Sequence, residues 1–134
     1  MSKERTYVML KPDALQRGLA GEIIGRIEAK GYRLVQAKTM MLDEAILKEH
    51  YAHIADKPFF PETVAYMTSG PVLAMIWEGE NAIAGIRQLM GATKFEEAKA
   101  GTIRGDYASS TTYNLIHGSD GPDTAEIEIK RFFG

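Results

Sequence analysis

The chain has 134 residues, a length that suits one compact domain spanning residues 1–134 and is too short for two ordinary domains. Its content of 45% hydrophobic and 25% charged residues is typical of globular proteins, which excludes disordered, collagen-like and coiled-coil classes. The 16 Lys and Arg residues against 18 Asp and Glu residues give a formal net charge of -2. This balance argues against a dedicated nucleic-acid binder, but a local cluster of cations could still hold a small anionic ligand.

The chain contains no cysteine, which excludes a disulfide framework, a thiol nucleophile and thiolate metal ligands. The N-terminal sequence MSKERTYVML lacks an apolar stretch of signal-peptide length. The longest apolar run, at residues 72–77, is far shorter than the roughly 20 residues of a membrane span. These features predict a cytoplasmic protein that is not anchored in a membrane.

Turn and capping residues divide the chain into alternating strands and helices. The apolar run at residues 6–10 stops at Pro12 and Asp13, which favours a strand ending in a turn. Asp43 and Asn81 each precede a helical hydrophobic pattern and are expected to cap it with their side chains, and Gly91 is expected to close the second of these helices. In chain order, strands are predicted at 6–10, 32–42, 72–77 and 114–117, and helices at 19–30, 44–54, 62–67, 82–90 and 122–133.

The order β-α-β-(αα)-β-α-β-α predicts an α+β fold, with helices packed on one face of a four-stranded sheet. The helices at 44–54 and 62–67 form a helical hairpin in this arrangement. Residues 91–113 contain three glycines and no clear periodicity, and we expect a long functional loop there. No repeat or linker divides the chain.

His117 lies where the last strand is expected to end, before the Gly-Ser-Asp turn of the sequence NLIHGSD. A neutral imidazole can attack phosphorus directly, and its pKa lies near physiological pH. Serine-hydrolase, P-loop and dinucleotide-binding motifs are missing from the sequence, so any phosphate site must be built from side chains. The alternative is a histidine that only stabilises the turn, and position alone favours that alternative.

Three cations are candidates for binding phosphate. Lys11 is expected at a strand end, Arg87 near the end of a helix, and Arg104 in the glycine-flanked sequence GTIRGDY. Each has a structural alternative, which for Arg104 is an ion pair with Asp106 that holds a turn. A cluster of the three cations around His117 would indicate a phosphate site, but sequence spacing alone cannot assemble it.

Two further histidines, His50 and His53, lie three residues apart in the predicted helix at 44–54, a spacing that can place two imidazoles on one metal ion. No third ligand stands at a matching offset, so solvated positions on the helix surface are the better interpretation. Tyr51 lies between them on the apolar stripe of the same helix, where core packing and a functional role are equally compatible with its position.

The motif NLIHGSD resembles the nucleoside diphosphate kinase family, and the resemblance extends from residue 6 to residue 133. The other matching segments, in the family's order, are YVMLKPDALQRG, HYAHIADKPFFPETV, SGPVLAMIWEGENAI, RQLMGAT and GTIRGDYA. The resemblance implies a ferredoxin-like α/β sandwich with a four-stranded antiparallel sheet, an added helical hairpin and a long active-site loop. It also implies ping-pong transfer of the γ-phosphate of a nucleoside triphosphate to a nucleoside diphosphate through a phosphohistidine at His117, with broad base specificity.

The resemblance further implies roles for individual residues. The residues expected around the phosphates and the ribose are Lys11, Tyr51, Arg87, Thr93, Arg104 and Asn114. Phe59 would stack on the base, and a π face common to all bases would explain the broad specificity. Ser119 and Glu128 would support His117, with Glu128 orienting the imidazole and stabilising the charge that develops during attack.

The same resemblance implies Mg²⁺ as cofactor, bridging phosphate oxygens and held mainly by the nucleotide and water, without a protein metal cage. Nucleoside di- and triphosphates would be the ligands, and a homo-oligomer is expected, with a hexamer favoured over a tetramer. Two positions depart from the commonest family pattern. Thr63 replaces an apolar residue often found beside the base, and Tyr113, in the stretch SSTTY, stands where a basic residue is frequent.

Proteins with this type of sandwich also serve as RNA-binding or small-ligand regulatory modules, which is the alternative class of function. An RNA-binding sheet needs exposed aromatic and basic residues, and the central strand VLAMIW has neither pattern. A regulatory module would leave His117 chemically idle, so covalent labelling by a nucleoside triphosphate distinguishes it from a kinase.

Overall fold

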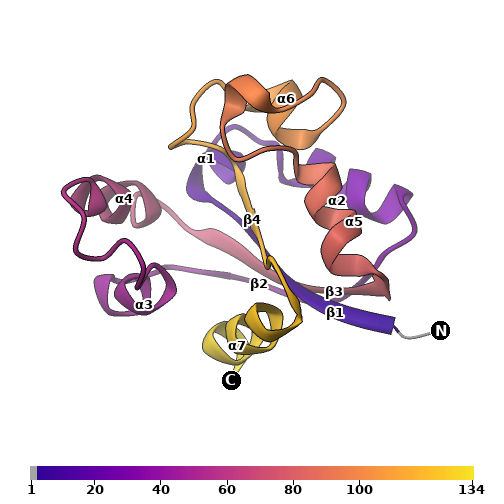
Figure 1. The fold of residues 1–134 in the computed structure, drawn as a ribbon, viewed down its shortest axis with the longest axis horizontal. Coiled ribbons are helices and arrows are strands. Elements are labelled where there is room, and N and C mark those ends of the chain that lie inside the picture. Colours follow the sequence, from indigo (N-terminus) through magenta and orange to yellow (C-terminus); the bar gives the residue numbers. More distant parts are fainter. Residues whose placement is uncertain (1–2) are drawn as a thin grey trace.

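A computed structural model of the protein describes residues 3–134 (Figure 1). Four strands form a single antiparallel sheet in the order β2-β3-β1-β4. The elements in chain order are β1 (Lys3–Leu10), α1 (Pro12–Gln16), α2 (Ala20–Ala29), β2 (Arg33–Met40), α3 (Glu44–His50), α4 (Phe60–Met67), β3 (Val72–Glu80), α5 (Ala82–Met90), the 3-10 helix η1 (Phe95–Glu97), α6 (Ile103–Tyr107), β4 (Ile116–Gly118) and α7 (Pro122–Phe133). The predicted order of strands and helices and the α+β class are confirmed.

The central strands β1 and β3 pair along their full length, whereas β4 pairs with β1 over three residues only. In that short pairing, His117 stands opposite Met9. Strands β2 and β4 form the two edges of the sheet. The pairing therefore brings the end of β1, where Lys11 follows, beside the segment that carries His117.

Helices cover both faces of the sheet, so the expectation that they pack on one face is wrong. Side chains alternate along β1: Val8 and Leu10 pack with α2 and α5, whereas Tyr7 and Met9 pack with α3, α4 and α7. Figure 1 shows α2 and α5 on the opposite side of the sheet from α3 and α7. A strand that carries apolar residues on both sides must be covered on both faces. The last five residues of β1 are all buried, as this requires.

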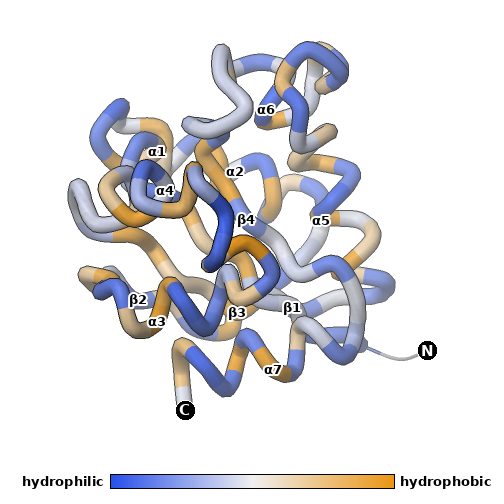
Figure 2. The backbone as a smooth tube through the Cα atoms, turned by 60° about the vertical axis from the view of Figure 1, so that its left-hand side comes forward, coloured by the Kyte–Doolittle hydropathy of each residue, from blue (hydrophilic) through white to orange (hydrophobic). Residues whose placement is uncertain are grey.

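The final helix, α7, begins with Pro122 in its first turn, as predicted. Its buried residues are Ala125, Glu128 and Phe132, which fall on one helical stripe. Figure 2 shows hydrophilic and hydrophobic residues alternating along this helix, as an amphipathic helix requires. A carboxylate therefore occupies a position on the buried stripe of α7, where an apolar residue would ordinarily pack.

The first of the two predicted caps is confirmed and the second is wrong. The Asp43 carboxylate accepts a hydrogen bond of 2.9 Å from the backbone N–H of Ile46 and so caps α3. Asn81 has a left-handed φ of 52° and makes no capping hydrogen bond with its side chain. The carboxylate of Glu4 accepts from Ile83 N–H at 2.9 Å instead, so the first turn of α5 is capped from strand β1.

Several boundaries also differ from the prediction, among them those of β1 and β3, which are longer than expected. A short helix, α1, follows Lys11 directly, where only a turn was expected. Helix α3 ends at His50 rather than continuing to residue 54. The segment 91–113 begins at Gly91, whose φ of 88° closes α5 as predicted, but it contains η1 and α6 and is not wholly irregular. None of the helices within residues 3–134 is long and apolar enough to cross a bilayer.

Candidate active site

A cavity of about 540 Å³ opens beside the end of β4, between α5, α7 and the segment that follows α3. All the site residues predicted from the sequence line it, except Phe59 and Ser119: Lys11, Tyr51, Arg87, Thr93, Arg104, Asn114, His117 and Glu128. These residues come from distant parts of the chain, and the short pairing of β4 with β1 is what brings Lys11 beside His117. The clustering of Lys11, Arg87 and Arg104 around His117 is the arrangement that would indicate a phosphate site.

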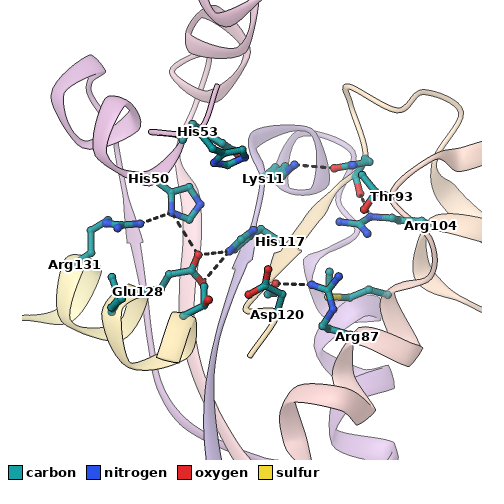
Figure 3. Close-up of a pocket in the computed structure, with 16 residues that line it drawn as sticks. Lys11, His50, His53, Arg87, Thr93, Arg104, His117, Asp120, Glu128 and Arg131 are labelled. Carbon is teal, nitrogen blue, oxygen red and sulfur yellow. Dashed lines mark hydrogen bonds and ion pairs between the residues drawn. The ribbon is translucent and has the colours of Figure 1, made fainter. Parts of the chain in front are cut away.

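His117 and Glu128 form the centre of this cavity (Figure 3). The Nε2 atom of His117 lies 3.0 Å from both carboxylate oxygens of Glu128. Ser119 is buried behind the pair, and its hydroxyl donates a 2.6 Å hydrogen bond to Oε1 of Glu128. An ionised carboxylate can only accept, so Nε2 carries the proton and the lone pair of the imidazole is on Nδ1.

The charge of Glu128 is maintained by these contacts. Burial on its own raises the pKa of the carboxyl, but the hydrogen bonds from His117 and Ser119 and the proximity of the imidazoles lower it to a net value below its usual range. The side chain is only 6% exposed. A buried, ionised carboxylate on one nitrogen of a partly exposed imidazole can stabilise positive charge on that ring.

His50 also lies at the site, because α3 ends with it and turns its side chain inward rather than to the surface as expected. Nη1 of Arg131 donates a 2.9 Å hydrogen bond to Nδ1 of His50. Burial, together with the nearby His117 ring, lowers the pKa of His50 to about 3, so this imidazole is neutral at physiological pH. Its ring packs edge-on against His117 with centroids 4.6 Å apart, which fixes one side of the His117 ring.

The group His50, His117 and Glu128 places one ligand atom of each residue within 4.8 Å of the others, which is close enough to consider a metal ion. The hydrogen bonds of these residues argue against a metal ion at this position. The lone pair of His50 Nδ1 is taken by Arg131, and Nε2 of His117 is taken by Glu128. His53 lies beyond the end of α3 and lines the cavity, so His50 and His53 do not share one helix face.

Arg104 does not pair with Asp106, so the structural alternative considered for it is wrong. Its guanidinium is almost fully buried and donates three hydrogen bonds to backbone carbonyls, those of Gly91, Asn114 and Ile116. Asp106 instead pairs with Arg26 at 2.7 Å. Since a guanidinium has five N–H groups, the remaining ones are available to the cavity that Arg104 lines.

Lys11 is partly buried and donates a 2.8 Å hydrogen bond from Nζ to Oδ1 of Asn114. Burial of the ammonium group, reinforced by the charge of Arg104, lowers the pKa of Lys11 to about 8, with Asp13 opposing this shift. The Nζ atom has two further N–H bonds with which it can contact an anion. Arg87 also lines the cavity and donates one N–H to the carbonyl oxygen of Gly118 at 3.1 Å.

A strained turn places Asn114 and His117. Leu115 has a φ of 76°, a left-handed conformation that is unusual for a branched residue, and its side chain is fully buried. Its carbonyl accepts from the backbone N–H of Lys11 at 2.8 Å, while Ile116 N–H donates to the carbonyl of Asn114 at 2.9 Å. This turn is the reason that β4 begins at Ile116 and not at residue 114 as predicted.

A smaller pocket of about 280 Å³ adjoins the cavity and shares Lys11, Tyr51, Thr93 and Asn114 with it. Phe59 lines this pocket with its ring half exposed, at 51% of its surface. Thr63 lies one turn further along α4 and lines the pocket too, as do Thr111 and Thr112. An exposed aromatic ring beside a cationic cavity is suited to a ligand with a flat ring and a phosphate chain.

Sequence reasoning did not single out Arg131 and Asp120, which also line the cavity. Arg131 stands one helical turn after Glu128 on α7, and the signal that could have identified it is this spacing from a carboxylate already assigned to the site. Asp120 is the residue after Ser119, in the turn before α7. It carries no signal beyond its proximity to the motif.

The fold and the cavity together define an α+β sandwich with a histidine–carboxylate pair in a cavity lined by cations. The sequence model of one family, described as "Nucleoside diphosphate kinase", matches residues 4–134. A nucleoside diphosphate kinase of Symbiobacterium thermophilum is 55% identical over 131 residues, covering 98% of this chain and 87% of the relative. One of Prochlorococcus marinus is 53% identical over 133 residues, covering 99% and 88%.

Solved structures give the same result. The nucleoside diphosphate kinase of Encephalitozoon cuniculi superposes with a TM-score of 0.95 at 48% identity, over 98% of this chain and 89% of that one. A halophilic nucleoside diphosphate kinase of Halobacterium salinarum in complex with CDP gives 0.94 at 54% identity, over 98% and 88%. The chain therefore belongs to the nucleoside diphosphate kinase family, and it is a phosphotransferase with the ferredoxin-like fold of that family.

Proposed function

We propose that the protein transfers the γ-phosphate of a nucleoside triphosphate to a nucleoside diphosphate in two steps, through a phosphohistidine at His117. The observation that carries the proposal is the His117–Glu128 contact of 3.0 Å inside the cationic cavity. It supports a tautomer in which Nδ1 is the free nucleophilic nitrogen. The Halobacterium relative's complex with CDP supports a nucleotide as the ligand of such a site.

In the first step, the lone pair of Nδ1 forms a bond to the γ-phosphorus while the bond from that phosphorus to its bridging oxygen breaks. The nucleoside diphosphate leaves with the electron pair of that bond. The imidazole becomes cationic because Nε2 keeps its proton, and the carboxylate of Glu128 compensates this charge. A second nucleoside diphosphate then takes the phosphoryl group by the reverse of the same step.

The cations of the cavity would bind and orient the phosphates. Lys11, Arg87 and Arg104 supply positive charge, and Tyr51, Thr93 and Asn114 supply polar contacts to phosphate or ribose. Burial raises the pKa of Tyr51 to about 12, so its hydroxyl is a neutral donor. Phe59 would stack on the base, and because stacking uses the π face that all bases share, we propose broad base specificity.

Mg²⁺ fits this site as an ion carried by the nucleotide. Glu128 is committed to His117 and Ser119, and Asp120 is the other carboxylate among the residues that line the cavity. The described residues therefore offer no cage of oxygen ligands, and the ion would be held mainly by phosphate oxygens and water, with Asp120 as the carboxylate of the lining that is left for it. When bound, Mg²⁺ offsets the charge of the phosphates.

We further propose that residues 1–134 act as one catalytic domain within a homohexamer, in the cytoplasm. The edge strand β2 supports assembly, because its residues 36–39 are exposed at the border of the sheet. The lack of cysteine is compatible with a reducing compartment. Light scattering measures the assembly directly, and a mass other than that of six chains would contradict the hexamer. The RNA-binding alternative is disfavoured, since both faces of the sheet are packed by helices.

The test of the proposed reaction is incubation with γ-labelled ATP, followed by removal of free nucleotide and addition of GDP or CDP. We expect a covalent label that is acid-labile and stable to alkali, and that moves to either diphosphate. His117→Ala is the control and should acquire no label. A wild-type protein that binds nucleotide but never becomes labelled would be a binding module, and the proposal would be wrong.

A further inference from the structure

Tyr113 belongs to a continuous series of contacts beside the smaller pocket, and the proposed reaction assigns no role to Tyr113. Its ring packs edge-on against Tyr66 of α4, with centroids 4.6 Å apart and planes at 81°. The hydroxyl of Tyr66 donates to the carboxylate of Asp13 at the start of α1. Two residues earlier in the chain, Lys11 binds Asn114, which directly follows Tyr113. The contacts therefore join α1, α4 and the segment before β4.

These contacts add to the core packing of Phe60, Tyr66 and Met67 in fixing α4 relative to the segment before β4. Phe59 directly precedes α4, so any shift of the helix moves the ring of Phe59. The segment on the other side of the contact is ordered by Ser110, whose hydroxyl oxygen accepts from the backbone N–H groups of Thr112 and Tyr113 at 3.1 and 3.2 Å. The contact between Tyr66 and Tyr113 thus connects the helix that follows Phe59 to the segment that supplies Thr111 and Thr112 to the same pocket.

The exposure and the contacts of Tyr113 indicate that it positions neighbouring elements and is not a core residue. Its side chain is 46% exposed, so burial of Tyr113 contributes little to the core. Its contact with Tyr66 is an edge-to-face pair, which depends on the ring and not on the hydroxyl. Loss of the ring would leave Tyr66 attached to Asp13 and α4 packed in the core, but would remove the aromatic contact between α4 and the segment that carries Asn114.

We propose that Tyr113 is a positioning residue for the nucleotide base: by packing against Tyr66 it holds α4, and with it Phe59, at a fixed distance from residues 111 and 112. This inference rests on the proposed function in one respect, the assignment of Phe59 to the base. It predicts that the effect of Tyr113 on affinity is exerted through Phe59 and is felt by purine and pyrimidine nucleotides alike.

The test is equilibrium binding by titration calorimetry, which requires no turnover. Tyr113→Ala should raise the Kd of both ADP and CDP by about 2- to 10-fold, the range expected for loss of one aromatic pair. The Kd of inorganic tripolyphosphate, which has no base, should stay the same. Tyr113→Phe keeps the ring and should restore wild-type affinity. Met41→Ala, at a similarly exposed apolar side chain that follows β2, is the matched control and should change nothing.

A double-mutant cycle tests whether Tyr113 influences nucleotide affinity through Phe59. If Tyr113 acts through Phe59, then Tyr113→Ala should cause no further loss of ADP affinity when Phe59 is already alanine. Additive losses in the double variant would overturn the inference, and so would a Tyr113→Phe variant as weak as Tyr113→Ala. An equal loss of tripolyphosphate affinity would overturn it as well, because Tyr113 would then act through Lys11 and Asn114.

Folding and the proposed reaction are checked separately. Thermal unfolding of each variant is compared with wild type, and Tyr113→Leu, which keeps apolar volume but no aromatic edge, should weaken nucleotide binding in the same direction as Tyr113→Ala. A wild-type protein that binds ADP but forms no phosphohistidine would refute the proposed reaction and not the role of Tyr113. Unchanged ADP affinity in Tyr113→Ala would refute the role of Tyr113 and not the reaction.

Discussion

Replacing Glu128 by glutamine removes the charge opposite His117 while keeping the shape of the side chain. The amide oxygen can accept from Nε2–H of His117, and the amide NH₂ can donate to the hydroxyl of Ser119. The Ser119 hydroxyl can then turn its proton to the carbonyl oxygen of Tyr7, which lies 3.3 Å away. Each partner therefore keeps one hydrogen bond, and what the variant loses is the second Nε2 contact and the charge beside the ring.

The size of the effect follows from the distances. A carboxylate about 4 Å from a cationic ring stabilises it by roughly 4 kcal/mol at an effective dielectric constant of about 20, which sets the upper limit. The lower limit, about 1.4 kcal/mol, is the difference between a charge-assisted and a neutral hydrogen bond. We therefore expect phosphorylation of His117 to slow by about 10- to 1,000-fold in Glu128→Gln. Lys11, Arg87 and Arg104 are untouched, so nucleotide affinity should change little.

The assay is a single-turnover quench experiment with γ-labelled ATP, performed beside a separate measurement of the Kd of ATP. An interaction made only in the transition state lowers kcat and kcat/KM together and leaves ground-state binding unchanged. Ser119→Ala is an informative comparison, because it removes the 2.6 Å hydrogen bond to Glu128 but keeps the charge, and its effect should be smaller. A sharp rise in Kd with an unchanged chemical step would refute the reasoning, since Glu128 would then be a binding residue.

Three further predictions concern His117, Phe59 and Lys11, in the roles proposed above. His117→Ala should abolish phosphate transfer and leave the protein folded, with a lowered melting temperature because the buried Glu128 carboxylate loses a hydrogen-bond donor; a folded variant with wild-type turnover would contradict this. Phe59→Ala should weaken all nucleotides by a similar factor, about 1–3 kcal/mol in binding free energy, and a loss confined to one base would indicate base readout. The value of kcat/KM should fall as pH rises through about 8, the lowered pKa of Lys11, and Lys11→Arg should remove that limb of the profile. In the unfolded chain the lysine has its ordinary pKa of 10.5, so the unfolded chain holds more protons than the folded protein between pH 8 and 10.5. Lys11 therefore contributes stability that increases with pH over this range, so its deprotonation should lower activity without lowering stability.

The succession of strands and helices could be predicted from the sequence, because hydrophobic periodicity and capping residues such as Asp43 and Pro122 act within one turn of the chain. Most of the residues that line the cavity could be named from the sequence as well, but through the order of the motifs around NLIHGSD and not through the chemistry of any single residue. On position alone, His117 and Arg104 were better explained as turn residues.

How those residues work together depends on contacts between distant parts of the chain. Spacing along the sequence cannot bring Lys11 to Asn114 or Glu128 to His117, since these contacts require the pairing of β4 with β1 and the packing of α7. Long-range contacts also overrode local signals. Glu4 capped α5 in place of Asn81, and three backbone carbonyls rather than Asp106 took the hydrogen bonds of Arg104. Local propensities amount to about 1 kcal/mol or less per residue, whereas a buried charged group without partners costs several times more, so tertiary contacts determine the geometry of the site.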